Sequence, residues 1–190
     1  AGEILRLMIT VPPRHGKSEL ASRRLPAWVM GNRPDIDIIA ASYSSDLASD
    51  FGREVRNIVA SPEYGALFPT RLAPDSQAAN RWHTSDGGMY VAAGVGTSIT
   101  GRGANILLID DPFKDREDAE RDIRRKRVWD WYTSTAYTRL APGGAIVVIN
   151  TRWHDDDLSG RLLSETNGDT WDLLSLPAIN NAGKALWPER

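Results

Sequence analysis

The 190-residue sequence contains no cysteine. Disulfide bonds, thiolate zinc sites and cysteine nucleophiles are therefore excluded. No apolar run reaches membrane-spanning length, and the N-terminus lacks the basic start and small-residue cleavage site of a signal peptide, so a soluble intracellular protein is expected. The formal net charge of -2 indicates no global basic surface. Any contact with nucleic acid therefore requires a local patch or several copies acting together.

Apolar, β-rich runs alternate with helical patterns, which is typical of a mostly parallel sheet covered by helices on both faces. The length favours a single domain over residues 1–190. Segment 62–80 is rich in Pro, Ala and Ser and is expected to be irregular, whereas Asp86 and Gly87 indicate a hairpin turn. The expected buried strands are residues 5–11, 36–41, 89–93, 105–110 and 145–150, with 171–176 as a possible sixth.

The stretch VPPRHGKSEL, residues 11–20, resembles a phosphate-binding loop in which Val11 replaces the usual first glycine. An apolar strand precedes it and the helical pattern 17–30, with Pro26 inside it, follows, so backbone N–H groups at a helix start can face an anion. In this frame Lys17 meets the β- and γ-phosphates of ATP and Ser18 binds Mg²⁺. The alternative is a proline-rich turn that precedes Gly-Lys-Ser by chance. The predicted nucleotide-binding residues are Pro13, Arg14, His15, Gly16, Lys17, Ser18 and Glu19.

A phosphate loop of this kind predicts a second motif, an apolar strand that ends in an acidic residue near Mg²⁺. The segment NILLIDDP, residues 105–112, fits that description. Asp110 is the predicted magnesium-associated carboxylate, and Asp111 is the predicted base that deprotonates the attacking water. The alternative is that Asp-Asp-Pro only ends a strand with turn-forming residues.

Three segments together resemble the large terminase subunits of tailed double-stranded DNA phages: PPRHGKS, GVGTSITGRGANILLIDDP and AIVVINTRWHDDDLSGRLL. The resemblance implies a three-layer α/β P-loop NTPase of the additional-strand, RecA-like branch, with the acidic strand beside the P-loop strand. It also implies an ATPase that translocates double-stranded DNA into a procapsid, as a ring, commonly of five subunits, on the portal protein. A small terminase subunit is a further implied partner, and the implied location is the host cytoplasm and, transiently, the portal vertex.

The same resemblance suggests roles for individual residues. Arg14 lies in the loop and is expected to contact the nucleotide, since a planar guanidinium suits phosphate oxygens; the alternative is pairing with a surface acid. Arg102 is a candidate for the arginine finger that acts on a neighbouring subunit, with ordinary surface placement as the alternative. Asn150 and Thr151 end a strand expected beside the P-loop strand and occupy the coupling position, which transmits the state of the γ-phosphate.

The sequence departs from the family in three ways. Asp111 stands where most members carry glutamate, so hydrolysis is expected to be slow unless another acid serves. The family's C-terminal RNase H-like nuclease domain is expected to be absent, and its upstream adenine-contacting segment is expected to be missing or incomplete. His154 and residues 155–157 suggest a metal site, but aspartates before an apolar helix are better explained as caps. A helicase-like nucleic-acid ATPase and an ATP-binding assembly module that is inactive in isolation are the alternative functions.

Overall fold

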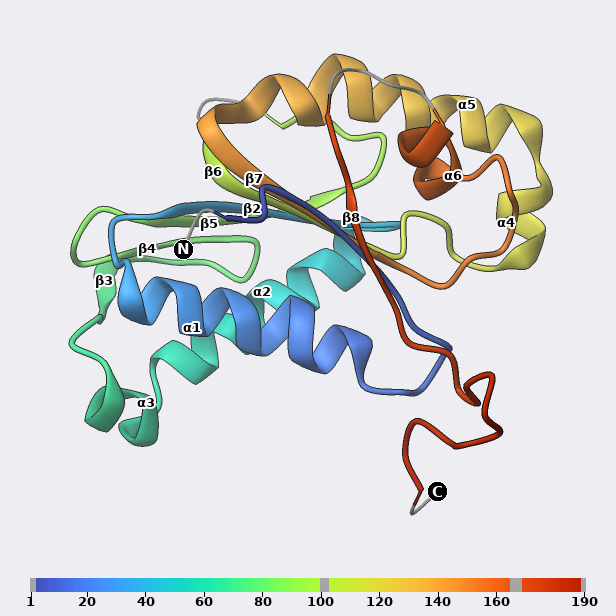
Figure 1. Cartoon of the computed structure of the whole chain (residues 1–190). Helices are drawn as coiled ribbons and strands as arrows, with labels where there is room; N and C mark the ends of the chain where they lie inside the picture. The colour runs from blue at the N-terminus through green and yellow to red at the C-terminus, as the bar shows by residue number, and fades with distance from the viewer. Residues whose placement is uncertain (1–2, 100–102, 165–168, 189–190) are drawn as a thin grey trace.

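The structure, a computed structural model, describes residues 3–99, 103–164 and 169–188. Its centre is an eight-stranded sheet in the order β3-β4-β5-β2-β6-β7-β1-β8, with helices on both faces (Figure 1). The strands are β1 (Arg6–Thr10), β2 (Asp37–Ser42), β3 (Leu72–Gln77), β4 (Arg81–Thr84), β5 (Met89–Gly94), β6 (Ala104–Asp110), β7 (Leu140–Asn150) and β8 (Asp172–Ser175). The six strands from β5 to β8 in this order run parallel, and β4 is antiparallel to β3 and β5. The predicted mixed α/β fold with a mostly parallel sheet is confirmed.

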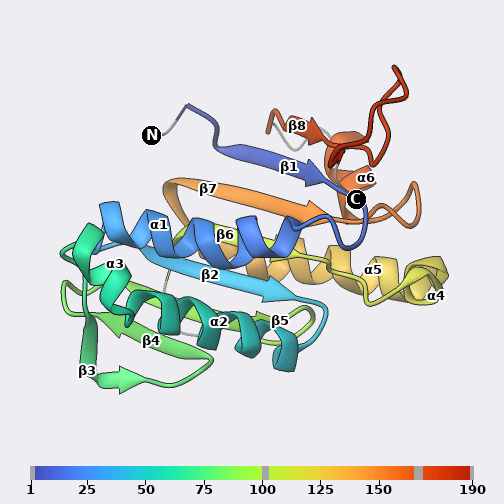
Figure 2. The ribbon, with the colours of Figure 1, turned by 90° about the horizontal axis from the view of Figure 1, so that it is seen from below.

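Two groups of helices cover the sheet. Figure 2 shows α1 and α2 in front of the sheet and α4 and α5 behind it. The first group comprises the π-helix η1 (Glu19–Arg24), α1 (Leu25–Asn32), α2 (Ser45–Val59) and α3 (Pro62–Leu67). The second comprises α4 (Arg116–Glu120), α5 (Asp122–Trp131), the π-helix η2 (Tyr132–Ala136), the 3₁₀ helix η3 (Tyr137–Arg139) and α6 (Leu158–Ser164).

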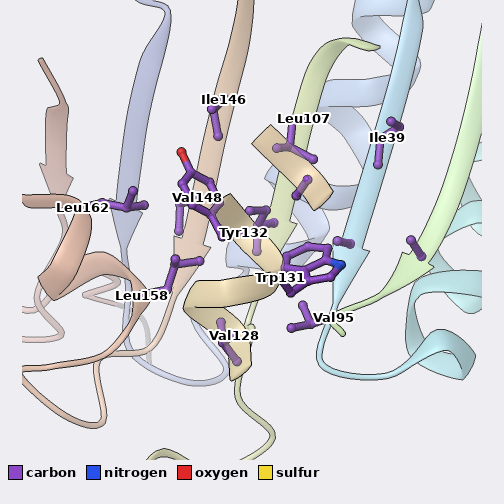
Figure 3. Close-up of a cluster of buried hydrophobic side chains, with 14 of the residues drawn as sticks. Ile39, Val95, Leu107, Val128, Trp131, Tyr132, Ile146, Val148, Leu158 and Leu162 are labelled. Atoms are coloured by element: carbon purple, nitrogen blue, oxygen red, sulfur yellow. The ribbon is translucent and has the colours of Figure 1, made fainter. Parts of the chain in front are cut away.

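The two sheet faces carry separate hydrophobic cores because successive side chains of a strand point to opposite faces. On the α5 face, Trp131 and Tyr132 pack with Ile146 and Val148 of β7 (Figure 3). On the α1 face, Val147 and Ile149 of the same strand join the second core. Strand β7 is therefore apolar on both faces, as a strand inside a parallel sheet requires.

This position of β7 corrects one expectation. The acidic strand β6 does not lie beside the P-loop strand β1, because β7 pairs in parallel with both of them. The predicted placement of the Asn150 strand next to the P-loop strand is confirmed, with Thr10 opposite Asn150. The ends of β1, β7 and β6 therefore meet in that order at one edge of the sheet.

Segment 62–80 is not irregular, and that prediction was wrong. Ser61 starts α3, since its hydroxyl oxygen accepts a hydrogen bond of 3.2 Å from the Tyr64 backbone N–H and Pro62 occupies the first turn. Tyr64 is buried and its hydroxyl donates to the Ala27 carbonyl at 2.9 Å. Strand β3 then forms the end of the sheet, a position where Pro74 is tolerated. The hairpin turn at Asp86 and Gly87 is confirmed between β4 and β5.

The helix after the phosphate loop differs in detail from the predicted helix 17–30. It is a π-helix over Glu19–Arg24 and becomes an α-helix at Leu25, directly before Pro26. Proline lacks an N–H group, so it is accommodated at the first turn of the α-helical part. The helix ends at Asn32, two residues beyond the predicted end at Met30. In the described parts of the chain, no helix is long and apolar enough to cross a lipid bilayer.

Candidate active site

The loop between β1 and η1 carries the predicted phosphate-binding residues. Gly16 has a φ of 84°, and a Cβ added there would meet no atom within 4 Å. Arg14 has a φ of 62°, a left-handed conformation that non-glycine residues adopt uncommonly. The loop therefore has strained backbone at Arg14 and open space in front of Gly16. A helix begins where the loop ends. The first N–H groups of a helix have no partner within it and are available to an anion.

The structure brings Lys17 and both predicted acids together. The Lys17 ammonium donates to Asp111 Oδ2, and it lies 3.5 Å from Asp110 Oδ1. The Lys17 side chain is 8% exposed, that of Asp110 1% and that of Asp111 28%. Two segments separated by more than ninety positions therefore place one cation between two carboxylates. Only Asp111 of the two acids has a substantial exposed surface.

Asp111 is held by backbone contacts on three sides. Its own N–H donates to the Ile149 carbonyl at 2.8 Å, and its carbonyl accepts from the Tyr43 N–H at 3.1 Å. Its Oδ1 accepts from the Thr151 N–H at 3.0 Å. Asp111 itself adopts a φ of 43°, and strained backbone of this kind persists only where neighbouring contacts maintain it. The ends of β2, β6 and β7 thus fix this carboxylate.

The electrostatic surroundings of Asp111 have opposing effects. Burial raises the pKa of the Asp111 carboxyl above its ordinary value, and Asp110 acts in the same direction. The charge and hydrogen bond of Lys17 lower that pKa, as does the hydrogen bond from Thr151. Burial is the largest influence, and the pKa is raised. A carboxylate with a raised pKa is a stronger base than one free in water.

A pocket of about 380 Å³ opens between the loop and Asp111. We call it the P-loop pocket; its lining residues are Pro13, Arg14, Gly16, Lys17, Ser18, Glu19, Arg23, Asp111, Phe113, Lys114, Thr151 and Trp153. Four of these side chains are cationic and two are acidic, a balance that suits a polyanion. Glu19 accepts hydrogen bonds from Arg24 and Arg23, each at 2.8 Å, and these bonds, that of Arg24 first, lower the pKa of the Glu19 carboxyl.

Two further predicted residues, His15 and Asn150, do not line the pocket. His15 lies beside the pocket, where its Nδ1 is 2.8 Å from the Pro13 carbonyl oxygen and its own carbonyl accepts from the Trp187 indole N–H at 3.4 Å. Asn150 is buried at the end of β7, and its Oδ1 has no hydrogen-bond partner among the described residues. Arg102 lies outside the described residues.

Sequence reasoning missed Ser22. Its hydroxyl donates to Asp110 Oδ2 at 2.6 Å, and Ser22 is completely buried. The signal was present in the helical pattern, because Ser22 follows Ser18 by four residues and so lies on the same side of the helix. Four further pocket residues were also missed: Arg23 in η1, and Phe113, Lys114 and Trp153, which follow strand ends.

The residues present fit a magnesium ion. Asp110 Oδ1 is buried and has no hydrogen-bond partner among the described residues, while Oδ2 is occupied by Ser22. Ser18 supplies a hydroxyl at the P-loop pocket. Carboxylate and hydroxyl oxygens are the ligands that Mg²⁺ prefers, usually with several retained waters.

The acidic run after β7 is a helix cap, as predicted. Asp157 Oδ1 accepts from the Gly160 N–H at 2.8 Å at the start of α6, and Asp157 pairs with Arg152 at 2.8 Å. Asp156 pairs with Arg125 and Arg161. Within residues 3–99, 103–164 and 169–188, no cluster of three or more His, Asp or Glu residues is arranged to hold a metal ion.

Comparison with known proteins gives a family and a fold. Residues 8–187 match the family model described as "Terminase large subunit, T4likevirus-type, N-terminal". No curated protein sequence matches the chain. The large terminase of bacteriophage HK97 is similar in structure, with a TM-score of 0.56 and 13% identity over 92% of this chain and 35% of that one.

Two further solved structures share the fold. The large terminase of a thermophilic bacteriophage, in complex with ATP-gamma-S, has a TM-score of 0.53 and 14% identity over 95% of this chain and 41% of that one. The N-terminal domain of the DNA packaging ATPase of bacteriophage phi29 has a TM-score of 0.50 and 11% identity over 95% of this chain and 91% of that one. The present chain thus spans well under half of the HK97 terminase and of the thermophilic phage terminase.

Proposed function

Because the chain belongs to the family of N-terminal domains of T4likevirus-type terminase large subunits, we propose that it is the ATPase domain of a phage genome-packaging motor and hydrolyses Mg-ATP. The observation that carries this proposal is the contact of Lys17 with both Asp110 and Asp111 at the P-loop pocket, which Lys17 and Asp111 line. A lysine from a phosphate loop and two acids from a strand end are the parts that P-loop ATPases use. The match of the thermophilic phage terminase, whose structure holds ATP-gamma-S, supports the nucleotide assignment.

Lys17 and the loop backbone bind the triphosphate in this proposal. The Lys17 ammonium, now paired with Asp111 and near Asp110, exchanges part of that contact for β- and γ-phosphate oxygens. Gly16 leaves room for the phosphates to approach the loop, since a Cβ there would occupy open space. Arg14 lines the same pocket, and its guanidinium can form two parallel hydrogen bonds to phosphate oxygens.

Ser18 and Asp110 are the residues that would hold Mg²⁺, Ser18 through its hydroxyl and Asp110 through Oδ1. Bound magnesium would neutralise negative charge on the phosphate oxygens. The chain itself fixes the orientation of Asp110, because Asp110 is buried and its Oδ2 accepts a hydrogen bond from Ser22.

Asp111 acts as the general base. Its side chain is the more exposed of the two acids and lines the pocket, so it can contact a water there. The water oxygen attacks the γ-phosphorus, its proton passes to the Asp111 carboxylate, and the bond from the γ-phosphorus to the bridging oxygen breaks to give ADP and phosphate. The pKa of Asp111, raised by burial, favours acceptance of that proton.

The coupling role of Thr151 is supported by its bond to the base. The Thr151 N–H donates to Asp111 Oδ1 at 3.0 Å, and the Thr151 hydroxyl lies 3.5 Å from the Val11 carbonyl oxygen. A change in the position of Asp111 during hydrolysis therefore acts directly on the end of β7, next to Asn150. This contact offers a route from the γ-phosphate to the segment that follows β7.

The motor uses this hydrolysis to translocate double-stranded DNA into a procapsid. It works as a homo-oligomeric ring, a pentamer on the portal protein, with DNA delivered by a small terminase subunit. Its location is the host cytoplasm and, during packaging, the portal vertex. Membership of the terminase family supports these partners, and the named relative from phi29 is itself a DNA packaging ATPase.

Displacement of a triplex-forming oligonucleotide from linear double-stranded DNA tests translocation. The chain, assembled with its portal, is expected to displace the oligonucleotide in the presence of Mg-ATP, and the Lys17→Ala variant is not. Strand separation on a forked duplex without triplex displacement would favour a helicase. Tight ATP binding without phosphate release, even with DNA and portal present, would indicate an assembly module.

A further inference from the structure

A completely buried hydrogen bond lies beneath the P-loop pocket. The Ser22 hydroxyl donates to Asp110 Oδ2 at 2.6 Å, from the helix η1 to the end of β6. Ser22 is 0% exposed and Asp110 is 1% exposed. Hydrogen bonds from a hydroxyl to an ionised oxygen are short, about 2.5–2.7 Å, and stronger than neutral ones. The Ser22 bond is therefore a firm constraint on the direction of the carboxylate.

The two oxygens of Asp110 differ in their surroundings. Oδ2 is bonded by Ser22, whereas Oδ1 has no hydrogen-bond partner among the described residues and lies 3.5 Å from the Lys17 ammonium. Ser42, the residue opposite Asp110 on β2, has a buried hydroxyl that bonds to no described residue. Ser22 is thus the hydroxyl that holds Asp110 in this part of the structure.

We propose that Ser22 is a positioning residue for the magnesium site: by bonding Oδ2 of Asp110, it orients Oδ1 toward the side of Lys17, which lines the P-loop pocket. The inference rests on the proposed ATPase function. It assigns different roles to two serines on one helix. Ser18 reaches the metal directly, and Ser22 acts one turn later through the carboxylate. Partners that orient a metal-associated group in this way typically change metal affinity or activity by about 10–100-fold when they are removed.

The alternative is that Ser22 serves only to satisfy a buried polar group. In that case its removal lowers stability but leaves the affinity of the site for metal unchanged. Ser159 provides a matched control, because it is also 0% exposed on a helix and its hydroxyl has no hydrogen-bond partner among the described residues. Ser159→Ala removes a buried hydroxyl without touching Asp110.

The test measures Mn²⁺ binding by EPR to the full chain in the presence of a non-hydrolysable ATP analogue. Ser22→Ala is expected to weaken Mn²⁺ binding by about tenfold or more, while the affinity for the analogue in EDTA stays at the wild-type level. Ser22→Thr retains a hydroxyl and is expected to restore Mn²⁺ binding. Ser159→Ala is expected to match wild type.

Two results would overturn the inference. Equal Mn²⁺ affinity in Ser22→Ala and Ser159→Ala, with both folded by thermal unfolding, would assign Ser22 a structural role only. If Ser22→Ala does not fold, Ser22→Thr decides: a folded Thr variant that loses Mn²⁺ binding despite keeping the hydroxyl bond would also contradict it. Wild-type chain that binds neither analogue nor Mn²⁺ would refute the proposed ATPase function, and the Ser22 inference with it.

Discussion

Among the described residues, left-handed backbone at non-glycine positions occurs at two residues that the proposed mechanism uses. Arg14 and Asp111 are non-glycine residues with positive φ, and both line the P-loop pocket beside Gly16. Such conformations cost about 1–3 kcal/mol each and persist where the surrounding contacts maintain them. For Asp111 those contacts are the backbone bonds to Tyr43, Ile149 and Thr151. The strain at this residue is thus maintained by these contacts, and the Asp111 side chain lines the pocket.

Asp111→Asn is expected to lower phosphate release by about 10²–10⁴-fold, the usual contribution of a general base. An amide cannot accept the proton from water, but it keeps the shape of the side chain and can accept the bond from Thr151. Nucleotide affinity, measured with a fluorescent ATP analogue, should remain within a few-fold of wild type. Asp86→Asn, in an exposed turn, is the control; normal turnover in Asp111→Asn would remove the assignment of the base.

Gly16→Ala tests whether the loop glycine has a role beyond its conformation. Gly16 and Gly87 have similar φ values of 84° and 91°, and an added Cβ meets no atom within 4 Å at either position. Each alanine variant is therefore expected to lose about 1–2 kcal/mol in the free energy of unfolding, the cost of a left-handed L-residue. Urea unfolding measures this loss.

Only Gly16→Ala is expected to weaken binding of the ATP analogue as well, by about tenfold or more, which corresponds to about 1.4 kcal/mol. The methyl group would occupy the open space in front of the loop, where the phosphates approach. Equal analogue affinities in Gly16→Ala and Gly87→Ala would show that the phosphates do not use this space.

The residues of the pocket were predictable to the extent that they lie in local motifs. Lys17, Asp110 and Asp111 follow from a loop pattern and a strand end, and the structure joins them. Ser22 was not predicted, because it lies outside both motifs and its contact with Asp110 joins positions 88 apart in the sequence. The roles of Asn150, Thr151 and Arg102 stay predictions, and Arg102 lies outside the described residues.

At the scale of elements, charged pairs tie α5 to α6. Asp156, just before α6, bonds to Arg125 of α5 at 3.1 Å and to Arg161 of α6 at 2.7 Å. These arginines, Arg161 first, lower the pKa of the Asp156 carboxyl to about 2. A depressed carboxyl pKa stabilises the fold above the pKa of the unfolded chain, and this stabilisation is lost as the pH falls toward about 2.

Asp156→Asn is therefore expected to lower the free energy of unfolding at pH 7 by at most about 1 kcal/mol, because the Asp156 side chain is 44% exposed and solvent screens the pair. The difference from wild type should shrink as the pH falls from about 4 toward about 2. Urea unfolding at several pH values measures it. A difference that stays constant across this range would show that the charge of Asp156 has no part in joining α5 to α6.

The positions of the strands and helices in the sequence were predicted better than the order in which the strands lie side by side in the sheet. Each of the six proposed strands exists; the first five are local apolar runs, whereas the sixth, β8, is exposed at all four of its residues. The helix α3 was missed because the Pro- and Ala-rich composition masked a start at Ser61. The place of β7 between β1 and β6 was also missed: it depends on β7 being apolar on both faces, and the order of strands in a sheet is not a local property.

At the scale of the whole molecule, the parallel strands β1, β7, β6 and β2 end on one side of the sheet (Figure 2). Ligands of open α/β sheets bind at such an edge, outside the carboxyl ends of the strands. The P-loop pocket lies there, between the loop after β1 and the residues after β6 and β7. One edge therefore holds the groups proposed for phosphate binding, metal binding, proton transfer and coupling.

The most direct test of the ATPase proposal is phosphate release from Mg-ATP across a range of protein concentrations, with Lys17→Ala and Arg102→Ala alongside wild type. Turnover per subunit is expected to rise with concentration as subunits assemble, and Lys17→Ala should lose about 10²–10³-fold of it. Arg102→Ala should show the same loss if this arginine acts on a neighbouring subunit. Wild-type chain that binds ATP but releases no phosphate at any concentration, or equal turnover in Lys17→Ala, would contradict the account.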